Sequence, residues 1–593
     1  MLSILLSWIY MGSIACIMGI AVFHGFQLVT KKINAEEKNR LPSFSYVLFL
    51  GVMGCTLYAQ LWGIFGGIAF EASIGLLIMV FLYIVFFPRY ILKLIKYWRN
   101  DQYAFLPENW TKRGNIKGAE NRIIVGLIII AGISYALASA GPAKLIDTPW
   151  YHAQNIRWLE EYGAVKGLGN LFPSLAYNNS QHYFDALFSM KWLWGQSLRN
   201  SGGFFGLILF IHGILRIAKW NTHKSHIADM IGIWEITYSI IVTAFYTDPY
   251  VDTLPNALVL VIFTEWIGRL EENTEDMGAM ILDCLLCIFA AVCKLSVVMV
   301  VFLALHPLII LLRQKRMKEI IVYLIMGISV ALPFLITNII TSGYLIYPLA
   351  SLDLFPVYWK MDKEILKYMV DSMVAFARMP AATMEEALNA GISWIPIWFQ
   401  NESVSHKLLY IVILMVTVYD IHRIIKQVIC DKEKSRGKIQ KELPMIWVRI
   451  CIYLGLLYWF FSIPQVKYCW AFLILPLAIV PIYYKQKSEG NRKASEKILL
   501  ISTMTVLLIY SGFYSLRTLG YMKEGILHYP IKQADYIVYN LEEIEVDNHK
   551  FYIRKEGGDL TCGYYAFPYL DNPENRNRLV LGQSLKDGIS YRK

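Results

Sequence analysis

The chain has 593 residues, of which 56% are hydrophobic and only 17% are charged, and its mean hydropathy is +0.43. These values exclude an ordinary soluble protein of this length and indicate a protein that crosses a membrane several times. The formal net charge is +11, but the basic residues flank apolar runs, where positive charge sets membrane topology. We therefore expect membrane lipids as partners and no nucleic acid.

About 14 apolar runs approach the length needed to cross the roughly 30 Å hydrocarbon core of a bilayer. They cover residues 3–26, 43–65, 68–87, 121–140, 203–218, 228–246, 254–268, 277–292, 295–312, 319–340, 407–422, 444–462, 466–484 and 498–517. The sequence therefore predicts an all-α polytopic membrane protein.

Basic residues are concentrated in alternate loops between these runs, which the positive-inside rule places in the cytoplasm. These residues are Lys31, Lys32, Lys38, Arg40, Arg89, Lys93, Lys96, Arg99, Lys112, Arg113, Arg313, Lys315, Arg316, Lys318, Arg423, Lys426, Lys432, Lys434, Arg436, Lys485, Lys487, Arg492 and Lys493. It follows that both termini and the polar loops described below are external. Within one cytoplasmic segment, RYILKLIKYWR (89–99), bases alternate with apolar residues at helical spacing, which suits a helix lying on an anionic leaflet.

We divide the chain into a membrane part, residues 1–519, and an external tail, residues 520–593. Two long external loops, 141–202 and 341–405, interrupt the membrane part. The tail has ordinary polarity and alternating patches, so we expect a small α/β domain. At about 75 residues it is marginal as an independent domain and should lean on the membrane part.

The first external loop contains the richest mixture of polar side chains, in the stretch DTPWYHAQNIRWLEEYGAVKGLGNLFPSLAYNNS (147–180). Asp147 follows closely after an apolar run, so its carboxylate should lie near the membrane surface. A base in that place can reach an acceptor hydroxyl in water while a second substrate stays in lipid. The alternative is that Asp147 caps a helix or is a solvated loop acid.

If the segment after Pro149 is helical, Tyr151 lies on a face flanked by His152 and Arg157. The planar guanidinium of Arg157 makes it a candidate ligand of a phosphate group. A surface arginine and a loop histidine are the alternatives. Further candidates for binding sugar hydroxyls are Tyr151, His152, Gln154, Asn170 and Asn178, although turn formation would also explain the asparagines.

Three later segments add charged or aromatic candidates. Asp248 and Asp252 flank the turn TDPYVD, where two carboxylates could bind a cation, assist the base or simply stay solvated. Lys294 interrupts an apolar stretch and Lys467 lies in the turn IPQVKY, so each either binds a lipid phosphate or extends its amine to the membrane surface. Tyr347, in ITSGYLIYP, should line the same cavity or belong to an aromatic belt.

These segments together resemble the GT-C superfamily of membrane glycosyltransferases, and more closely a group of bacterial multi-span membrane proteins of unassigned function. The resemblance rests on DTPWYHAQNIRWLEEYGAVKGLGNL, AYNNS, TDPYVD, KLS, ITSGYLIYP, IPQVKY and the tail segment GDLTCGYYAFPYLDN. It implies many membrane helices, an active site on the external face, a polyprenyl-phosphate sugar donor and a catalytic base at Asp147. Many superfamily members have paired acids where this chain has Asp147 alone, so a divalent cation is left open and no other cofactor is implied.

The expectation that follows is an inverting glycosyltransferase of the bacterial cytoplasmic (inner) membrane, which transfers a sugar to an envelope or surface glycan acceptor. Asp147 and Asp248 would be catalytic, and Lys294, Lys467 and Arg157 would bind the donor phosphate. The acceptor or sugar would contact His152, Tyr151, Gln154, Asn170, Asn178, Asp252 and Tyr347. One alternative is a repeat-unit polymerase or ligase acting on lipid-pyrophosphate glycans, which would use bases without a catalytic acid. Another is a flippase or transporter. The intramembrane acids Glu235, Glu265 and Asp283 keep this alternative open, because such acids often mark a transport pathway.

Overall fold

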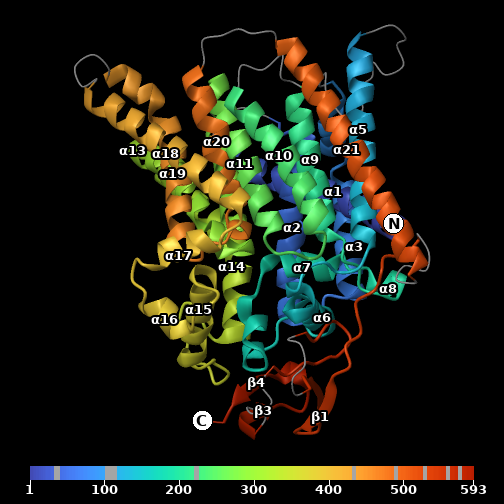
Figure 1. Cartoon of the computed structure of the whole chain (residues 1–593). Helices are drawn as coiled ribbons and strands as arrows, with labels where there is room; N and C mark the ends of the chain where they lie inside the picture. Colours follow the sequence, from blue (N-terminus) through green and yellow to red (C-terminus); the bar gives the residue numbers. More distant parts are fainter. Residues whose placement is uncertain are drawn as a thin grey trace.

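A bundle of long helices forms most of the molecule in the computed structural model, and the β-strands of the tail gather at one end of the bundle (Figure 1). We call this end the tail end. The structure describes every residue except 32–40, 101–115, 219–225, 275, 431–435, 486–491, 525–530, 556–560, 572–576 and 593. The predicted all-α membrane architecture is therefore confirmed at the level of a mostly helical chain with several long apolar helices.

Within the described residues, eight helices are long and apolar enough to cross a membrane, or up to nine if one bent pair is a single span. The eight are α1 (Leu2–Lys31), α2 (Phe44–Phe65), α5 (Ile116–Ala140), α10 (His226–Phe245), η5 (Leu295–Ala304) continued by α13 (Leu305–Arg313), α14 (Met317–Ser342), α18 (Val404–Cys430) and α19 (Arg436–Phe461). Shorter or more polar helices accompany them: α9 (Ser201–Ile217), α11 (Thr253–Glu272), α12 (Met277–Cys293), α20 (Trp470–Lys485) and α21 (Arg492–Lys523). The expected total of about 14 spans stays a prediction.

The bent pair consists of α3 (Phe70–Phe86) and α4 (Pro88–Asn100), which meet at an angle of 85°. Pro88 begins α4, as expected of a residue that cannot continue the hydrogen bonding of a preceding helix. Ile91 and Leu94 on the buried face of α4 pack against Ile20 of α1 and Val47 of α2. The helix predicted for residues 89–99 is thus confirmed, while its binding to an anionic leaflet stays a prediction.

The first long loop, residues 141–202, folds into short helices against the tail end of the bundle. They are η2 (Thr148–His152), α6 (Ala153–Glu161), η3 (Leu168–Asn170), η4 (Pro173–Tyr177), α7 (Ser180–Leu187) and α8 (Lys191–Trp194). The helix predicted after Pro149 is therefore confirmed. Gly163 follows α6 with φ +75°, and a Cβ there would lie 2.3 Å from the carbonyl oxygens of Gly63 and Gly66. Only glycine allows the loop to approach the end of α2 so closely.

The second long loop contains α15 (Lys363–Arg378), α16 (Met384–Asn389) and α17 (Trp394–Asn401), and the turn before α20 contains η6 (Val466–Tyr468). The tail forms two antiparallel hairpins, β1 (Glu542–Val546) with β2 (His549–Ile553) and β3 (Leu579–Leu581) with β4 (Ile589–Tyr591). Among the described residues after α21, the only helix is the single 3₁₀ turn η8 (Leu585–Asp587). The expected mixed α/β tail is therefore built almost entirely of short hairpins.

The tail shares a hydrophobic core with the first loop instead of forming one of its own. Trp158 and Phe172 of the loop belong to the same buried cluster as Phe551, Tyr569 and Ile589 of the tail. Such sharing is expected for a segment too short to bury a sufficient core alone. The prediction that the tail leans on the rest of the chain is thus confirmed.

Arg157 of α6 fastens the tail to the loop. Its guanidinium carbon lies 5.2 Å from the ring centroid of Tyr564 and 4.6 Å from that of Phe567. Its Nη1 donates hydrogen bonds to the carbonyl oxygens of Tyr564, at 2.9 Å, and Tyr565, at 3.1 Å. The planar, charged group is therefore held between two rings and two carbonyls.

Gln154 adds two more hydrogen bonds at the same junction, from Nε2 to the carbonyl oxygens of Gly563, at 2.9 Å, and Ala566, at 2.8 Å. The amino terminus lies at this end too, because the amide of Ser3 donates to the carbonyl of Ile531 at 2.9 Å. This bond places the start of α1 beside the segment that follows α21. Which side of the membrane is external stays a prediction. Of the basic residues on which that prediction rests, eight lie outside the described residues: Lys32, Lys38, Arg40, Lys112, Arg113, Lys432, Lys434 and Lys487.

We expect Arg157→Ala to loosen the tail without unfolding the helical bundle. The substitution removes two charge-assisted hydrogen bonds and two ring contacts, which should cost about 2 kcal/mol of docking free energy. In hydrogen–deuterium exchange, the amides of residues 561–570 should then exchange about 30-fold faster. Lys550→Ala, at an exposed position of β2, is the control. Unchanged exchange in Arg157→Ala would show that other contacts hold the tail.

Candidate functional site

Asp147 lies at the start of η2 and faces a lysine from a distant turn. Its carboxylate makes no capping hydrogen bond to its own helix, and its Oδ2 lies 3.3 Å from Nζ of Lys467 in η6. Burial lowers the pKa of Lys467, but Tyr468, Asp147 and Asp252 outweigh that effect and hold the pKa above its usual value. The Lys467 amine therefore stays positively charged beside Asp147.

A second ion pair lies next to the first. Lys294, directly after α12, pairs with Asp252, directly before α11. The ring of Tyr468 lies between the two lysines, with its centroid 4.3 Å from Nζ of Lys294 and 5.1 Å from Nζ of Lys467. We call Asp147, Asp252, Lys294, Lys467 and Tyr468 the paired-lysine cluster.

Asn256 of α11 fixes the two turns of this cluster relative to each other. Its Nδ2 donates to the carbonyl of Asp252 at 2.9 Å, and its Oδ1 accepts from the amide of Ala471 at 2.9 Å, just beyond η6. We had not singled out Asn256 from the sequence. The sequence signal for Asn256 is a polar amide side chain near the start of the otherwise apolar run 254–268.

A cavity of about 370 Å³ opens beside the cluster. Lys294 and Tyr468 line its polar end, while Phe334 of α14, Met373 of α15 and Trp459 of α19 contribute to an apolar wall. Two of these helices, α14 and α19, are candidate membrane spans. The cavity thus joins positive charge to an apolar space within the membrane part of the chain.

Several polar side chains in the cavity have no hydrogen-bond partner among the described residues. His182 is 1% exposed and Tyr347 is 2% exposed, and both ring nitrogens of His182, the hydroxyl of Tyr347 and the hydroxyl of Ser296 are unpartnered. Buried polar atoms are nearly always hydrogen-bonded in folded proteins. Their arrangement around one cavity therefore suits a polar ligand, and Tyr151 and Tyr347 are among the residues that line it.

His152 and His182 form a buried pair with ring centroids 4.9 Å apart. Burial, followed by the charges of Lys294 and Lys467, holds the pKa of His152 well below its usual value. Burial, His152 and Lys294 do the same for the pKa of His182. Both imidazoles are therefore neutral at pH 7, and each offers one hydrogen-bond donor and one acceptor. That combination suits sugar hydroxyls.

Asp248 holds the irregular segment that leads from α5 to Asp147. Its carboxylate accepts hydrogen bonds from Nη1 of Arg199 at 3.1 Å and from the amides of Lys144 and Leu145 at 2.6 Å and 3.0 Å. Arg199 also donates to tail and loop carbonyls, so it links Asp248 to the tail. We had not expected Arg199, although a basic residue just before an apolar run was a visible signal.

Of the predicted site residues, Tyr151, Lys294 and Tyr347 line the cavity. Arg157, Gln154, Asn170 and Asn178 bind other parts of the protein. Asn170 donates from Nδ2 to the carbonyls of Trp359, at 3.0 Å, and Ile589, at 3.1 Å, and so joins both long loops to the tail. Asn178 has φ +46° and donates to Oγ1 of Thr337 in α14 at 2.8 Å. The structure therefore does not bring these four side chains to the paired-lysine cluster.

Asp248 and Asp252 do not share a ligand position, because one binds Arg199 and the other binds Lys294. Across the described part of the chain, no group of three or more His, Cys, Asp and Glu side chains could hold a metal ion. A divalent cation in the site stays a prediction.

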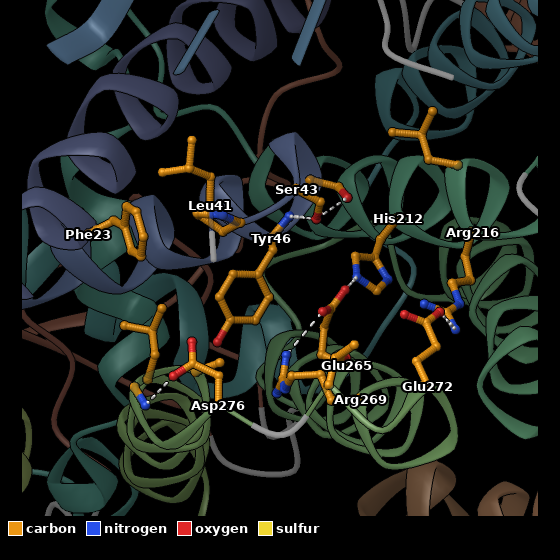
Figure 2. A pocket seen from close by; sticks show the side chains of 18 of the residues that line it. Phe23, Leu41, Ser43, Tyr46, His212, Arg216, Glu265, Arg269, Glu272 and Asp276 are labelled. Carbon is orange, nitrogen blue, oxygen red and sulfur yellow. Dashed lines mark hydrogen bonds and ion pairs between the residues drawn. The ribbon is translucent and has the colours of Figure 1, made fainter. Parts of the chain in front are cut away.

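A second polar cavity, of about 190 Å³, lies at the other ends of α11 and α12. Figure 2 shows Glu265 between His212, at 3.3 Å, and Arg269, at 3.2 Å. His212 also binds Glu235 at 2.7 Å, and Arg269 also pairs with Asp283. The intramembrane acids on which the transporter alternative rests, Glu235, Glu265 and Asp283, are thus all in ion pairs. These ion pairs connect α9, α10, α11 and α12.

A family model described as "Domain of unknown function (DUF8201)" matches residues 1–474. The chain belongs to this family. No curated protein and no solved structure matches it. The family region of this DUF8201 chain includes every residue of the paired-lysine cluster, whereas the tail that supports the first loop follows it.

One buried acid lies behind the histidine pair. Asp185 is one turn after His182 in α7 and is 3% exposed. Burial raises the pKa of Asp185 to about 8, and the side chains of Ser201 and Gln181 only partly oppose that rise. Asp185 therefore binds a proton in the folded protein at pH values where it is ionised in the unfolded chain.

We expect this proton to make stability depend on pH. Because the folded pKa exceeds the ordinary value of 3.8, the stabilising contribution is complete below about pH 4 and is lost as the pH rises through about 8. Raising the pH from 6 to 9 should therefore lower the melting temperature of wild type by a few degrees more than that of Asp185→Asn. Differential scanning fluorimetry checks this, with the exposed Glu545→Gln as control. A constant difference over that range would exclude a buried protonated Asp185.

Proposed function

We propose that this chain is an inverting glycosyltransferase of GT-C type that transfers a sugar from a polyprenyl-phosphate donor to an envelope or surface glycan acceptor. The observation that carries the proposal is the paired-lysine cluster, whose Lys294 and Tyr468 line the polar end of an apolar cavity. A polyprenyl phosphate has the matching chemistry, because its head is anionic and its chain is hydrocarbon. The apolar wall on α14 and α19 would take the first units of that chain.

Lys294 and Lys467 would bind the donor phosphate and stabilise the charge that develops as the phosphate leaves. At present each amine is paired with a carboxylate. Asp252 is almost fully buried and would keep Lys294 in place. Lys467, whose side chain is 31% exposed, would turn from Asp147 towards the phosphate.

Asp147 would then act as the general base. Once Lys467 turns to the phosphate, the carboxylate loses its cation and accepts a proton more readily. The acceptor oxygen attacks the anomeric carbon while its proton passes to Asp147, and the bond between that carbon and the phosphate oxygen breaks. The electron pair leaves with the lipid phosphate, and the configuration at carbon inverts.

The neutral histidine pair and Tyr347 would bind hydroxyls of the transferred sugar, with Tyr151 as part of the wall. Their unpartnered polar atoms lie where the head of the donor would be. We place this site at the external face of the bacterial cytoplasmic membrane, with both termini on that side, as the alternation of basic loops predicts.

The test is transfer of labelled sugar from polyprenyl-phosphate donors by purified protein in liposomes. We expect Asp147→Asn to lower the rate by at least about 100-fold, because it removes the general base. Lys467→Gln should also reduce transfer, whereas Asp362→Asn, at an exposed position before α15, should transfer normally. Melting temperatures verify that each variant is folded.

Full activity in Asp147→Asn would exclude Asp147 as the general base. If activity were then lost only when Lys294 or Lys467 is replaced, a polymerase or ligase acting on lipid-pyrophosphate glycans would fit better, since pyrophosphate chemistry needs the cations alone.

A further inference from the structure

An apolar groove of about 690 Å³ runs along the outside of the bundle between α10 and α21, at their tail ends. Figure 1 shows α21 lying beside α5 along this side of the molecule. Phe245 of α10 and Ile509 and Phe513 of α21 line the groove and are 63%, 68% and 56% exposed. The groove shares no lining residue with the cavity beside the paired-lysine cluster. A surface of this kind on a membrane protein faces hydrocarbon.

Two basic residues lie at the tail end of the groove, where α10 ends and the segment before Asp147 passes. Lys144 donates from Nζ to the carbonyl of Ala244 at 3.2 Å, and its amine lies 4.9 Å from the ring centroid of Tyr514. Arg517 donates from Nε to the hydroxyl of Tyr521 at 2.6 Å. Among the described residues, neither side chain forms an ion pair.

Lys144 is partly buried in this position. Burial lowers the pKa of Lys144 to about 8, with Asp248 opposing the shift and the charges of Arg517 and Arg199 adding to it. Two cations without an ion-pair partner among the described residues favour an anion at the head of this groove. The apolar walls below them favour a hydrocarbon chain attached to it.

We propose that this groove binds one anionic phospholipid of the surrounding bilayer, with its phosphate on Lys144 and Arg517 and one acyl chain along α10 and α21. A bilayer lipid fits better than a sugar donor, because the groove is open along its length. Like the cavity beside the paired-lysine cluster, the groove has two bases at its head, but it has no histidine among its lining residues.

The bound lipid would also stabilise the segment that leads to Asp147. The backbone amides of Lys144 and Leu145 are fixed by Asp248 at 2.6 Å and 3.0 Å, and a phosphate on the Lys144 side chain would secure the same residue from the membrane side. This site stands whether or not the chain transfers sugars.

Native mass spectrometry of the full chain, released from nanodiscs that contain equal amounts of phosphatidylglycerol and phosphatidylcholine with identical acyl chains, tests the proposal. We expect one phosphatidylglycerol to be retained in preference to phosphatidylcholine. Arg517→Gln should reduce that preference about fivefold, as expected for one surface charge, and the double variant with Lys144→Gln should reduce it by more than about tenfold. Arg517 is exposed, so the single variant should fold normally.

Lys523→Gln is the matched control, because Lys523 is an exposed base on the same helix outside the groove. Equal retention of the two lipids by wild type would overturn the proposal. So would an equal loss in Lys523→Gln, which would mean diffuse attraction by surface charge. Displacement of phosphatidylglycerol by added polyprenyl phosphate at equimolar concentration would also overturn it, because the groove would then be a site for a substrate lipid.

Discussion

The ion pair between Asp147 and Lys467 is the contact on which the arrangement of the site depends. It joins the start of the first loop to the turn before α20, and the neighbouring pair of Lys294 and Asp252 joins the ends of α11 and α12. Charges near a membrane interior are costly unless they are paired. Each carboxylate of the cluster therefore neutralises one amine as long as no anionic ligand is bound. The two amines are thereby held in place for such a ligand.

The remaining polar residues of the first loop provide the support that this cluster needs. Asp248 fixes the segment before Asp147, and Arg199 connects Asp248 to the tail. Arg157 and Asn170 bind backbone carbonyls of the tail. The tail thus stabilises the loop from outside, which explains why a segment with such small sheets is joined to a large helical bundle.

Hydropathy and loop charge predicted the helical membrane architecture, because long apolar runs have few other stable solutions in a bilayer. The sequence also singled out the four charged members of the paired-lysine cluster, since charges beside apolar runs stand out. It did not separate ligand-facing residues from supporting ones, because Arg157, Gln154 and Asn170 have the same chemistry in either role. Asn256, Arg199 and His182 depend on contacts between distant segments, which spacing along the chain does not reveal.

The most direct test of the account is a cryo-electron microscopy map of the protein in nanodiscs with a non-transferable polyprenyl-phosphate sugar analogue. We expect density for the phosphate between Lys294 and Lys467, the lipid chain along α14 and α19, and Lys467 turned away from Asp147. An empty cavity, with the analogue bound elsewhere or not at all, would contradict the assignment of the paired-lysine cluster as the donor site.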